Sequence, residues 1–244
     1  MYHAKVTSAT AGRIFRQLSH DKRTIALIFV VPSVLIALLR WLFSDNLMLF
    51  NSIAPALLGV FPFVIMFIIT SITTLRERTS GTMERLMATP IAKIDLLLGY
   101  MIAFSVLAAM QALIASALLL YAFDLNIAGH DGLLVGIAII DAMLGTALGL
   151  FVSAFARTEF QAVQFMPAFV LPQFLIGGLL VPLSKMPDLL EKIAYALPLT
   201  YAIDALNRTT TEVSISGEMI RDIAVVLIWI VVAIVLGALT LKRK

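Results

Sequence analysis

The chain has 244 residues, of which 61% are hydrophobic and 14% charged, and its net charge is +3. Its mean hydropathy is +1.00. Soluble domains are only about 45–50% apolar, so this composition excludes a soluble globular protein and indicates an integral membrane protein. The chain has no cysteine, which excludes disulfides and thiolate metal sites. The N-terminal arm lacks the apolar core of a secretory signal, so we expect no cleavage there.

Apolar windows long enough to cross a bilayer predict an all-α fold with six transmembrane helices. A helix needs about 20 residues to cross a hydrocarbon core of about 30 Å, and its backbone groups are satisfied within the segment. We treat residues 1–244 as one membrane domain, with an arm (1–23) and a six-helix part (24–241). The predicted windows are Thr24 to Phe43, Ile53 to Leu75, Leu96 to Phe123, Leu133 to Phe155, Gln161 to Leu183 and Ile223 to Leu241.

The distribution of basic residues predicts the orientation in the membrane. Of the 18 lysines and arginines, 13 lie in the arm, in the 2–3 and 4–5 connections and at the C-terminus, against 5 in the other connections. Cytoplasmic segments retain lysine and arginine, so both termini are expected in the cytoplasm of a multi-pass plasma-membrane protein.

The arm itself predicts an amphipathic helix from Ser8 to His20. Ala11, Ile14, Phe15 and Leu18 fall on one face, with Arg13, Arg16 and Gln17 on the other. Such a helix is expected to lie along the inner leaflet. Anchoring to anionic lipid is one predicted role of this arm, and it does not exclude a contact with another protein.

A polar stretch, RERTSGTMERLMATP (Arg76 to Pro90), separates the second and third windows. It predicts a helix of about two turns that ends at Pro90, too short to be stable alone in water. Met83, Leu86 and Met87 form one apolar stripe with a charged rim. The stripe fits a groove on another protein, or else it packs on lipid headgroups or on its own chain.

This stretch closely resembles the cytoplasmic coupling segment of ABC-2 type transporter permeases, the membrane subunits of ATP-driven exporters of the daunorubicin-resistance kind. A second stretch, GGLLVPLSKMPDLLEKIAYALPLTYAIDALNR (Gly177 to Arg208), resembles the same family. The resemblance implies that the first stretch docks on a nucleotide-binding subunit. The residues that it assigns to coupling are Arg76, Glu77, Arg78, Gly81, Thr82, Met83, Glu84, Arg85, Leu86, Met87, Thr89 and Pro90.

The chain carries no ATPase signature of its own. No glycine precedes a lysine, which excludes a Walker A loop, and neither HExxH nor GxSxG occurs. We therefore expect no enzymatic activity, no metal site and no cofactor in this chain, with ATP and Mg²⁺ bound by a separate ATPase. The resemblance implies two ATPase subunits and a second permease, which we expect to be a copy of this chain. Membrane lipid is a further expected partner, and nucleic acid is not.

Polar and aromatic residues inside the second, fourth and fifth windows are candidates for the transport path. Proline and amide groups are tolerated within lipid where neighbouring helices or a cavity satisfy the freed polar groups. Ordinary helix packing is the alternative for each, and Asp141 can also serve a structural hydrogen bond. Gly145 and Gly149 indicate close helix packing. The path candidates are Phe61, Phe63, Phe67, Asp141, Gln161, Gln164 and Gln173.

Between the fifth and sixth windows, residues 184–222 form the only sizeable external segment. Its apolar spacing is helical and is broken by Pro198, which predicts two short re-entrant helices. The whole pattern predicts export of a hydrophobic or amphipathic compound by alternating access. An ion-driven secondary carrier or channel is the first alternative, and a membrane anchor without transport is the second.

Overall fold

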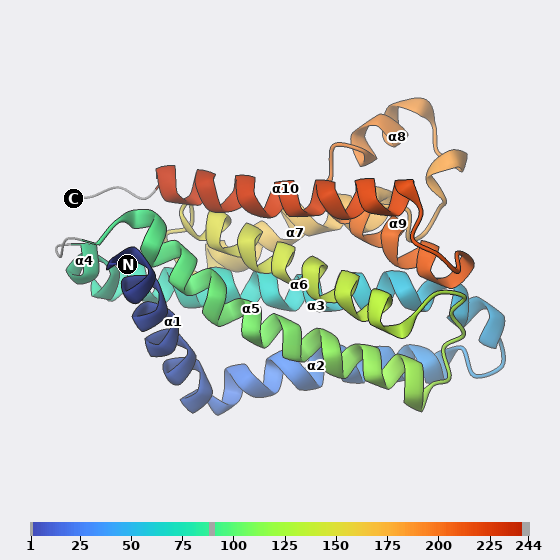
Figure 1. The fold of residues 1–244 in the computed structure, drawn as a ribbon, viewed down its shortest axis with the longest axis horizontal. Coiled ribbons are helices and arrows are strands. Elements are labelled where there is room, and N and C mark those ends of the chain that lie inside the picture. The colour runs from blue at the N-terminus through green and yellow to red at the C-terminus, as the bar shows by residue number, and fades with distance from the viewer. Residues whose placement is uncertain (1, 88–90, 241–244) are drawn as a thin grey trace.

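The described chain is helical, and its long helices lie side by side (Figure 1). The structure is a computed structural model that describes residues 2–87 and 91–240, except the side chains of Tyr2, Glu84, Met87 and Ser184. No strand occurs within these ranges, so the predicted all-α class is confirmed. The bundle consists of α2 (Lys22–Leu42), α3 (Leu47–Thr79), α5 (Lys93–Ala117), α6 (Asp131–Ser153), α7 (Glu159–Ile176) and α10 (Gly217–Thr240).

Four further helices occupy the two ends of this bundle in the described part of the chain. The helices α1 (Tyr2–His20) and α4 (Thr82–Met87) lie at one end, where α10 also finishes (Figure 1). The helices α8 (Asp188–Ala194) and α9 (Pro198–Thr211) lie at the opposite end. A π turn, η1 (Leu118–Ala122), continues α5, and a 3-10 turn, η2 (Leu183–Lys185), precedes α8. The beginning of α1 and the end of α10 are therefore on the same side of the bundle as α4.

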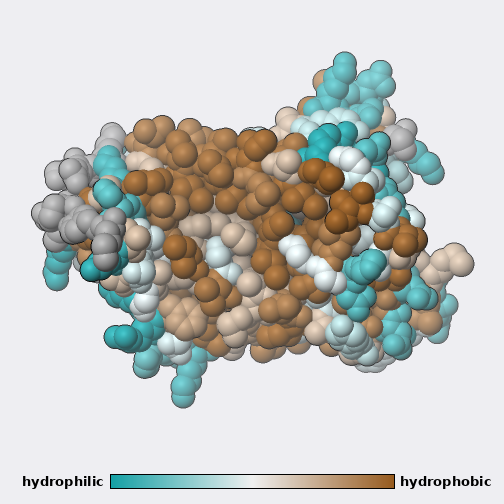
Figure 2. Space-filling model, in the orientation of Figure 1, coloured by the Kyte–Doolittle hydropathy of each residue, from teal (hydrophilic) through white to brown (hydrophobic). Residues whose placement is uncertain are grey.

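Five of the long helices are long and apolar enough to cross a membrane: α2, α3, α5 with its π turn, α6 and α10. Figure 2 shows the result as a broad hydrophobic belt with hydrophilic side chains at both ends. The helix α7 is shorter, at 18 residues, and carries three glutamines. The chain is thus a membrane protein with several apolar spans, and the sixth span stays a prediction at α7.

The helix α3 is the centre of the bundle and packs most extensively against α6. A Cβ atom added to Gly145 would lie 2.3 Å from the carbonyl oxygen of Phe63, and one on Gly149 would lie 2.6 Å from that of Phe67. The two backbones meet this closely only because both positions are glycine, as in other small-residue contacts between membrane helices. The predicted packing role of this pair is confirmed.

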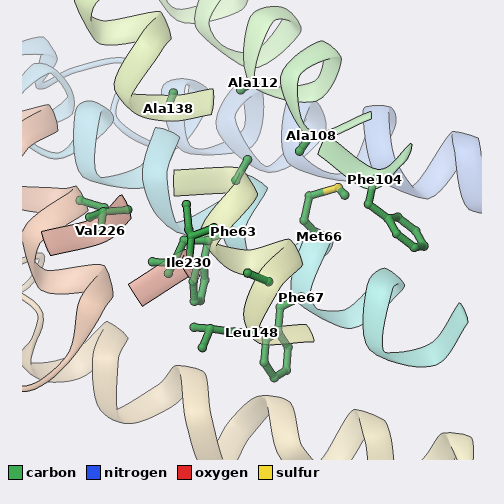
Figure 3. Packing of buried hydrophobic residues seen from close by; sticks show 14 of the residues in the cluster. Phe63, Met66, Phe67, Phe104, Ala108, Ala112, Ala138, Leu148, Val226 and Ile230 are labelled. Carbon is green, nitrogen blue, oxygen red and sulfur yellow. The ribbon is translucent and has the colours of Figure 1, made fainter. Parts of the chain in front are cut away.

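Aromatic and small side chains fill the space around α3. Figure 3 shows Phe63 and Phe67 of α3 facing side chains from the neighbouring helices. The two rings stack with centroids 6.5 Å apart. Alanines of α5 and α6 belong to the same buried cluster, which is filled by large and small side chains together. The labelled members of the core are Phe63, Met66, Phe67, Phe104, Ala108, Ala112, Ala138, Leu148, Val226 and Ile230.

Two predicted boundaries change in the structure. The helix α3 has 33 residues, or about 50 Å at 1.5 Å per residue, and extends beyond a hydrocarbon core of about 30 Å. The second predicted window ends at Leu75, whereas α3 continues through Arg76, Glu77 and Arg78 to Thr79, so these three residues belong to its last turns. The helix α7 ends at Ile176 instead of Leu183 because the chain turns at Gly178, whose φ of +90° is accessible to glycine without strain.

Residues 184–222 contain two short helices, α8 and α9, as predicted, and Pro198 is the first residue of the second. The fixed φ of proline suits a first helical position, where no backbone N–H is needed. The helix α9 buries one side against α3, α6 and α10, whereas α8 protrudes with Leu189 exposed (Figure 1).

Candidate coupling site

Three consecutive residues at the C-terminal end of α3 each bind a different part of the protein. Arg76 forms a two-pronged ion pair with Glu159 of α7, with N–O distances of 2.7 and 2.9 Å. Arg78 donates to the carbonyl oxygen of Ser153 at the end of α6, where the helix dipole favours a positive charge. Glu77 faces α1 and α5. The end of α3 is therefore fixed to α1, α5, α6 and α7 together.

Glu77 is the buried member of this group, with 4% of its surface exposed. Arg13 of α1 donates to both carboxylate oxygens, at 3.1 and 2.9 Å, and the Tyr100 hydroxyl of α5 also donates to Glu77. Arg13 lies 3.2 Å from the Tyr100 oxygen as well. Burial lowers the pKa of Arg13, but the hydrogen bonds and charge of Glu77 outweigh this and raise it above its ordinary value. The pair is thus a charged, hydrogen-bonded connection between three helices.

The amphipathic helix α1, which carries Arg13, also packs against α5. A Cβ atom added to Gly99 of α5 would lie 2.6 Å from the Cβ of Thr10, so the two helices touch at their backbones. Ile14 and Leu18 are buried, whereas Phe15, predicted on the same face, is 39% exposed. The predicted amphipathic helix is present and starts earlier than Ser8, and its apolar face packs on α5. Its position along the inner leaflet stays a prediction. Its polar face, including Arg16, remains exposed.

The coupling segment continues from α3 through a tight turn. Gly81 has a φ of +74°, and its carbonyl oxygen accepts the Arg85 N–H at 3.1 Å, so the six-residue α4 starts directly after it. Met83 is 1% exposed and belongs to the protein's own core, and Leu86 packs against that core. This is the alternative in which the stripe packs on its own chain. The side chains of Glu84 and Met87, and residues Thr89 and Pro90, lie outside the described part.

Arg85 is the exposed charged side chain that the structure describes on α4. Because Met83 is buried, a docking partner would meet the charged rim of the segment and not its methionine. Thr82 is half-buried, and its hydroxyl lies 3.1 Å from that of Ser80, which helps to hold the turn.

The transport-path candidates lie in different surroundings on α3, α6 and α7. Phe63 and Phe67 are fully buried in the core, and Phe61 is half-buried. Gln161 accepts the Arg157 N–H at 2.9 Å, which orders the connection before α7. Gln164 is exposed on α7.

Gln173 has a structural contact that the sequence does not reveal. Its amide nitrogen donates to the Phe169 carbonyl at 2.8 Å, and its oxygen accepts the Leu199 N–H at 3.1 Å. Leu199 is near the start of α9, where backbone N–H groups have no partner within the helix. Gln173 therefore joins α7 to α9, which is the packing alternative for this residue.

Asp141 is fully buried between α6 and α3, and neither carboxylate oxygen has a hydrogen-bond partner in the described chain. It lies one turn before Gly145. A Cβ atom added to Gly59 of α3 would be 3.2 Å from the Oδ2 atom of Asp141. The carboxyl group therefore lies against α3 at a position where α3 has a glycine. In this conformation Asp141 borders the helix contact and not an open path.

Arg13 and Tyr100 are the site residues that sequence reasoning missed. Tyr100 lies within an apolar window, and Arg13 is one of several basic residues on the arm. The available signal was Glu77 itself, a carboxylate at the edge of an apolar window that needs a cation when it is buried.

Comparison with known proteins gives a consistent result. The family model described as ABC-2 type transporter matches residues 6–209. The probable multidrug ABC transporter permease YbhS of Escherichia coli is 27% identical over 84% of this chain and 55% of its own length. The permease YbhR, with the same description and from the same organism, is 26% identical over 62% of this chain and 41% of its own length.

A third relative comes from another organism. ABC transporter G family member 20 of Dictyostelium discoideum is 25% identical over 82% of this chain and 28% of its own length. The aligned region thus spans about half or less of the curated relatives. Because the family model covers most of the chain, including α1, the coupling segment and α9, the chain belongs to the ABC-2 type transporter family.

Proposed function

We propose that this chain is the permease subunit of an ABC exporter that moves a hydrophobic or amphipathic compound out of the cytoplasm or the inner leaflet. Permeases of this family generally work with a separate ATPase subunit and do not hydrolyse ATP themselves. The observation that carries the proposal is the position of α4, which follows α3 through one glycine turn. The end of α3 is bound to four other helices by Arg76, Glu77 and Arg78.

Alternating access would use this connection. Closure of two ATPase subunits on ATP and Mg²⁺ would push α4 and tilt α3. The contact of Glu77 with Arg13 and Tyr100 would carry α1 and α5 along, and the pair of Arg76 with Glu159 would carry α7. In this scheme α3 and α7 change their spacing, and the path opens between them and the second permease.

The exposed face of α7 supports a second permease, which we propose is another copy of this chain. Phe160 is 72% and Leu175 53% exposed, and Gln164 is exposed between them. An amide is costly in lipid, so a polar group on a membrane helix usually faces another helix or a cavity. Phe160, Gln164, Leu171 and Leu175 recur at helical spacing, which fits one contact stripe.

An ion-driven carrier or channel is the alternative. Asp141 is the observation in its favour, because a buried carboxyl group can bind a cation or a proton. However, among the described residues no three His, Cys, Asp or Glu side chains converge on a possible ion site. We therefore favour the separate ATPase of the family as the energy source.

Docking at α4 can be tested with one charge reversal. Arg85→Glu is expected to weaken co-purification of the cognate ATPase by roughly tenfold, because a like charge would face a partner selected for the arginine. Arg23→Glu reverses an equally exposed charge on α2 and is the control. Retained ATPase binding in Arg85→Glu, or an equal loss in Arg23→Glu, would rule out docking through the rim of α4.

We propose that α1 and the end of α10 face the cytoplasm at the plasma membrane. The chain has no cysteine, so single cysteines at Lys5, Ala128 and Ser214 can be labelled without background. An impermeant thiol reagent added to intact cells should label positions 128 and 214 and leave position 5 unlabelled. The reverse pattern would invert the topology.

A further inference from the structure

A cavity of about 580 Å³ lies at the end of the bundle opposite α4. Its walls are the beginning of α3, the turn after α7 and one side of α9. The volume is within the range of about 300–1,000 Å³ that accommodates drug-sized ligands. The lining residues include Ser52, Leu180, Tyr195, Asp204, Asn207 and Arg208.

The cavity is apolar on one side and polar on the other. Ile53 and Ala56 of α3 and Leu179 of the turn after α7 provide the apolar wall. The polar wall is α9, where Asp204, Asn207 and Arg208 are three and four residues apart and so share one face. A molecule with an apolar body and one polar group matches this division.

Arg208 does not make this wall positive, because acidic residues surround it. Its guanidinium pairs with Glu212 at 2.9 Å and with Glu218, and lies 3.5 Å from Asp204 and 3.6 Å from Asp222. Arg221 adds one more cation, paired with Asp222. Four carboxylates thus accompany two guanidinium groups, which leaves the formal charge negative.

The remaining lining groups favour a cation over an anion. The Oδ1 atom of Asn207 is buried without a hydrogen-bond partner, which leaves an acceptor to be satisfied. Asp204 keeps 36% of its side chain exposed and contacts Arg208 only at 3.5 Å. Tyr195 adds an aromatic ring, whose face attracts cations.

We infer that this cavity is a binding site for amphipathic cations at the release side of the permease. The inference rests on the proposed export function for its role in transport, whereas the binding itself needs neither ATP nor the ATPase. The apolar body of the ligand would lie against α3 and the turn after α7. Its positive charge would lie between Asp204, Asn207 and Tyr195.

Binding can be measured on the full chain in lipid nanodiscs without nucleotide. Leu180→Cys places a polarity-sensitive fluorophore on an exposed lining position of a cysteine-free chain. Tetraphenylphosphonium and tetraphenylborate have nearly the same shape and opposite charge. We expect tetraphenylphosphonium, and not tetraphenylborate, to shift the fluorescence saturably above the signal from empty nanodiscs.

Three variants locate this binding. Asp204→Asn should raise the Kd for tetraphenylphosphonium about tenfold, and Ser52→Phe, at an exposed lining position, should obstruct the cavity and abolish the shift. Asp188→Asn removes an acid of α8 that does not line the cavity and should leave the Kd unchanged. Ser52→Phe leaves the ion pairs of Arg208 intact, so it tests binding in this cavity even if Asp204→Asn does not fold.

Equal responses to the two probes, or an unchanged Kd in folded Ser52→Phe, would overturn the assignment. Failure of the export proposal has a different signature. In that case tetraphenylphosphonium would bind with the expected variant pattern, but the chain with its ATPase would show no ATP-dependent transport.

Discussion

Gly145→Leu is expected to prevent assembly of the folded membrane domain, and Gly145→Ala to destabilise it measurably. Even a single Cβ at this position would lie 2.3 Å from the carbonyl oxygen of Phe63, which is backbone and cannot rotate away. Helices α3 and α6 would have to separate, and overpacking of this kind typically costs about 1–3 kcal/mol. A leucine adds three further carbons to the same contact.

The same helix offers a matched control. No atom comes within 4 Å of a Cβ built on Gly136, so Gly136→Ala changes composition and helix propensity without a clash. Detergent-solubilised protein can be followed by size-exclusion chromatography after heating. We expect Gly136→Ala to match the unmodified chain, with Gly145→Ala lost at a lower temperature. Equal melting of the two alanine variants would mean that α3 and α6 do not meet at Gly145.

Glu77→Ala is expected to detach α1 and to uncouple ATP hydrolysis from transport. The change leaves the half-buried Arg13 and the buried Tyr100 hydroxyl without their shared acceptor. Removal of one partner of a buried pair costs about 3–5 kcal/mol, and because Arg13 is 35% exposed we expect the lower end or less. Hydrogen exchange in α1 should rise, with basal ATP hydrolysis by the complex kept and transport per ATP lowered.

The exposed ion pair between the neighbouring residue Arg76 and Glu159 provides the control for Glu77→Ala. Arg76 and Glu159 are 56% and 52% exposed, and exposed pairs contribute only about 0–1 kcal/mol. Glu159→Ala should therefore leave hydrogen exchange in α1 unchanged. If Glu77→Ala also leaves it unchanged, the carboxylate does not hold α1 in place.

The long apolar runs made most of the fold predictable. A helix that crosses lipid needs a minimum length, and its backbone groups must be paired within the helix. The positions of the apolar runs therefore locate α2, α3, α5, α6 and α10. Helix ends were harder to predict, because α3 continues through three charged residues once their side chains find partners on other helices. The end of α7 depends on the backbone conformation of Gly178, which hydropathy does not contain.

The candidate site was predictable as a segment but not as a set of contacts. Arg13 and Glu77 are 64 residues apart, and nothing local selects Arg13 over its basic neighbours. The burial of Met83 was likewise invisible, because a methionine stripe fits a partner's groove and the protein's own core equally well. Tertiary packing decides between them.

Transport by the reconstituted complex tests the central claim most directly. The chain and its cognate ATPase would be placed together in liposomes, with a fluorescent amphipathic compound outside and ATP supplied to the face that carries α4. We predict accumulation that requires both subunits and hydrolysable ATP and that is lost with Arg85→Glu. Accumulation by the chain alone under an ion gradient, with no requirement for the ATPase, would contradict the account and support the secondary-carrier alternative.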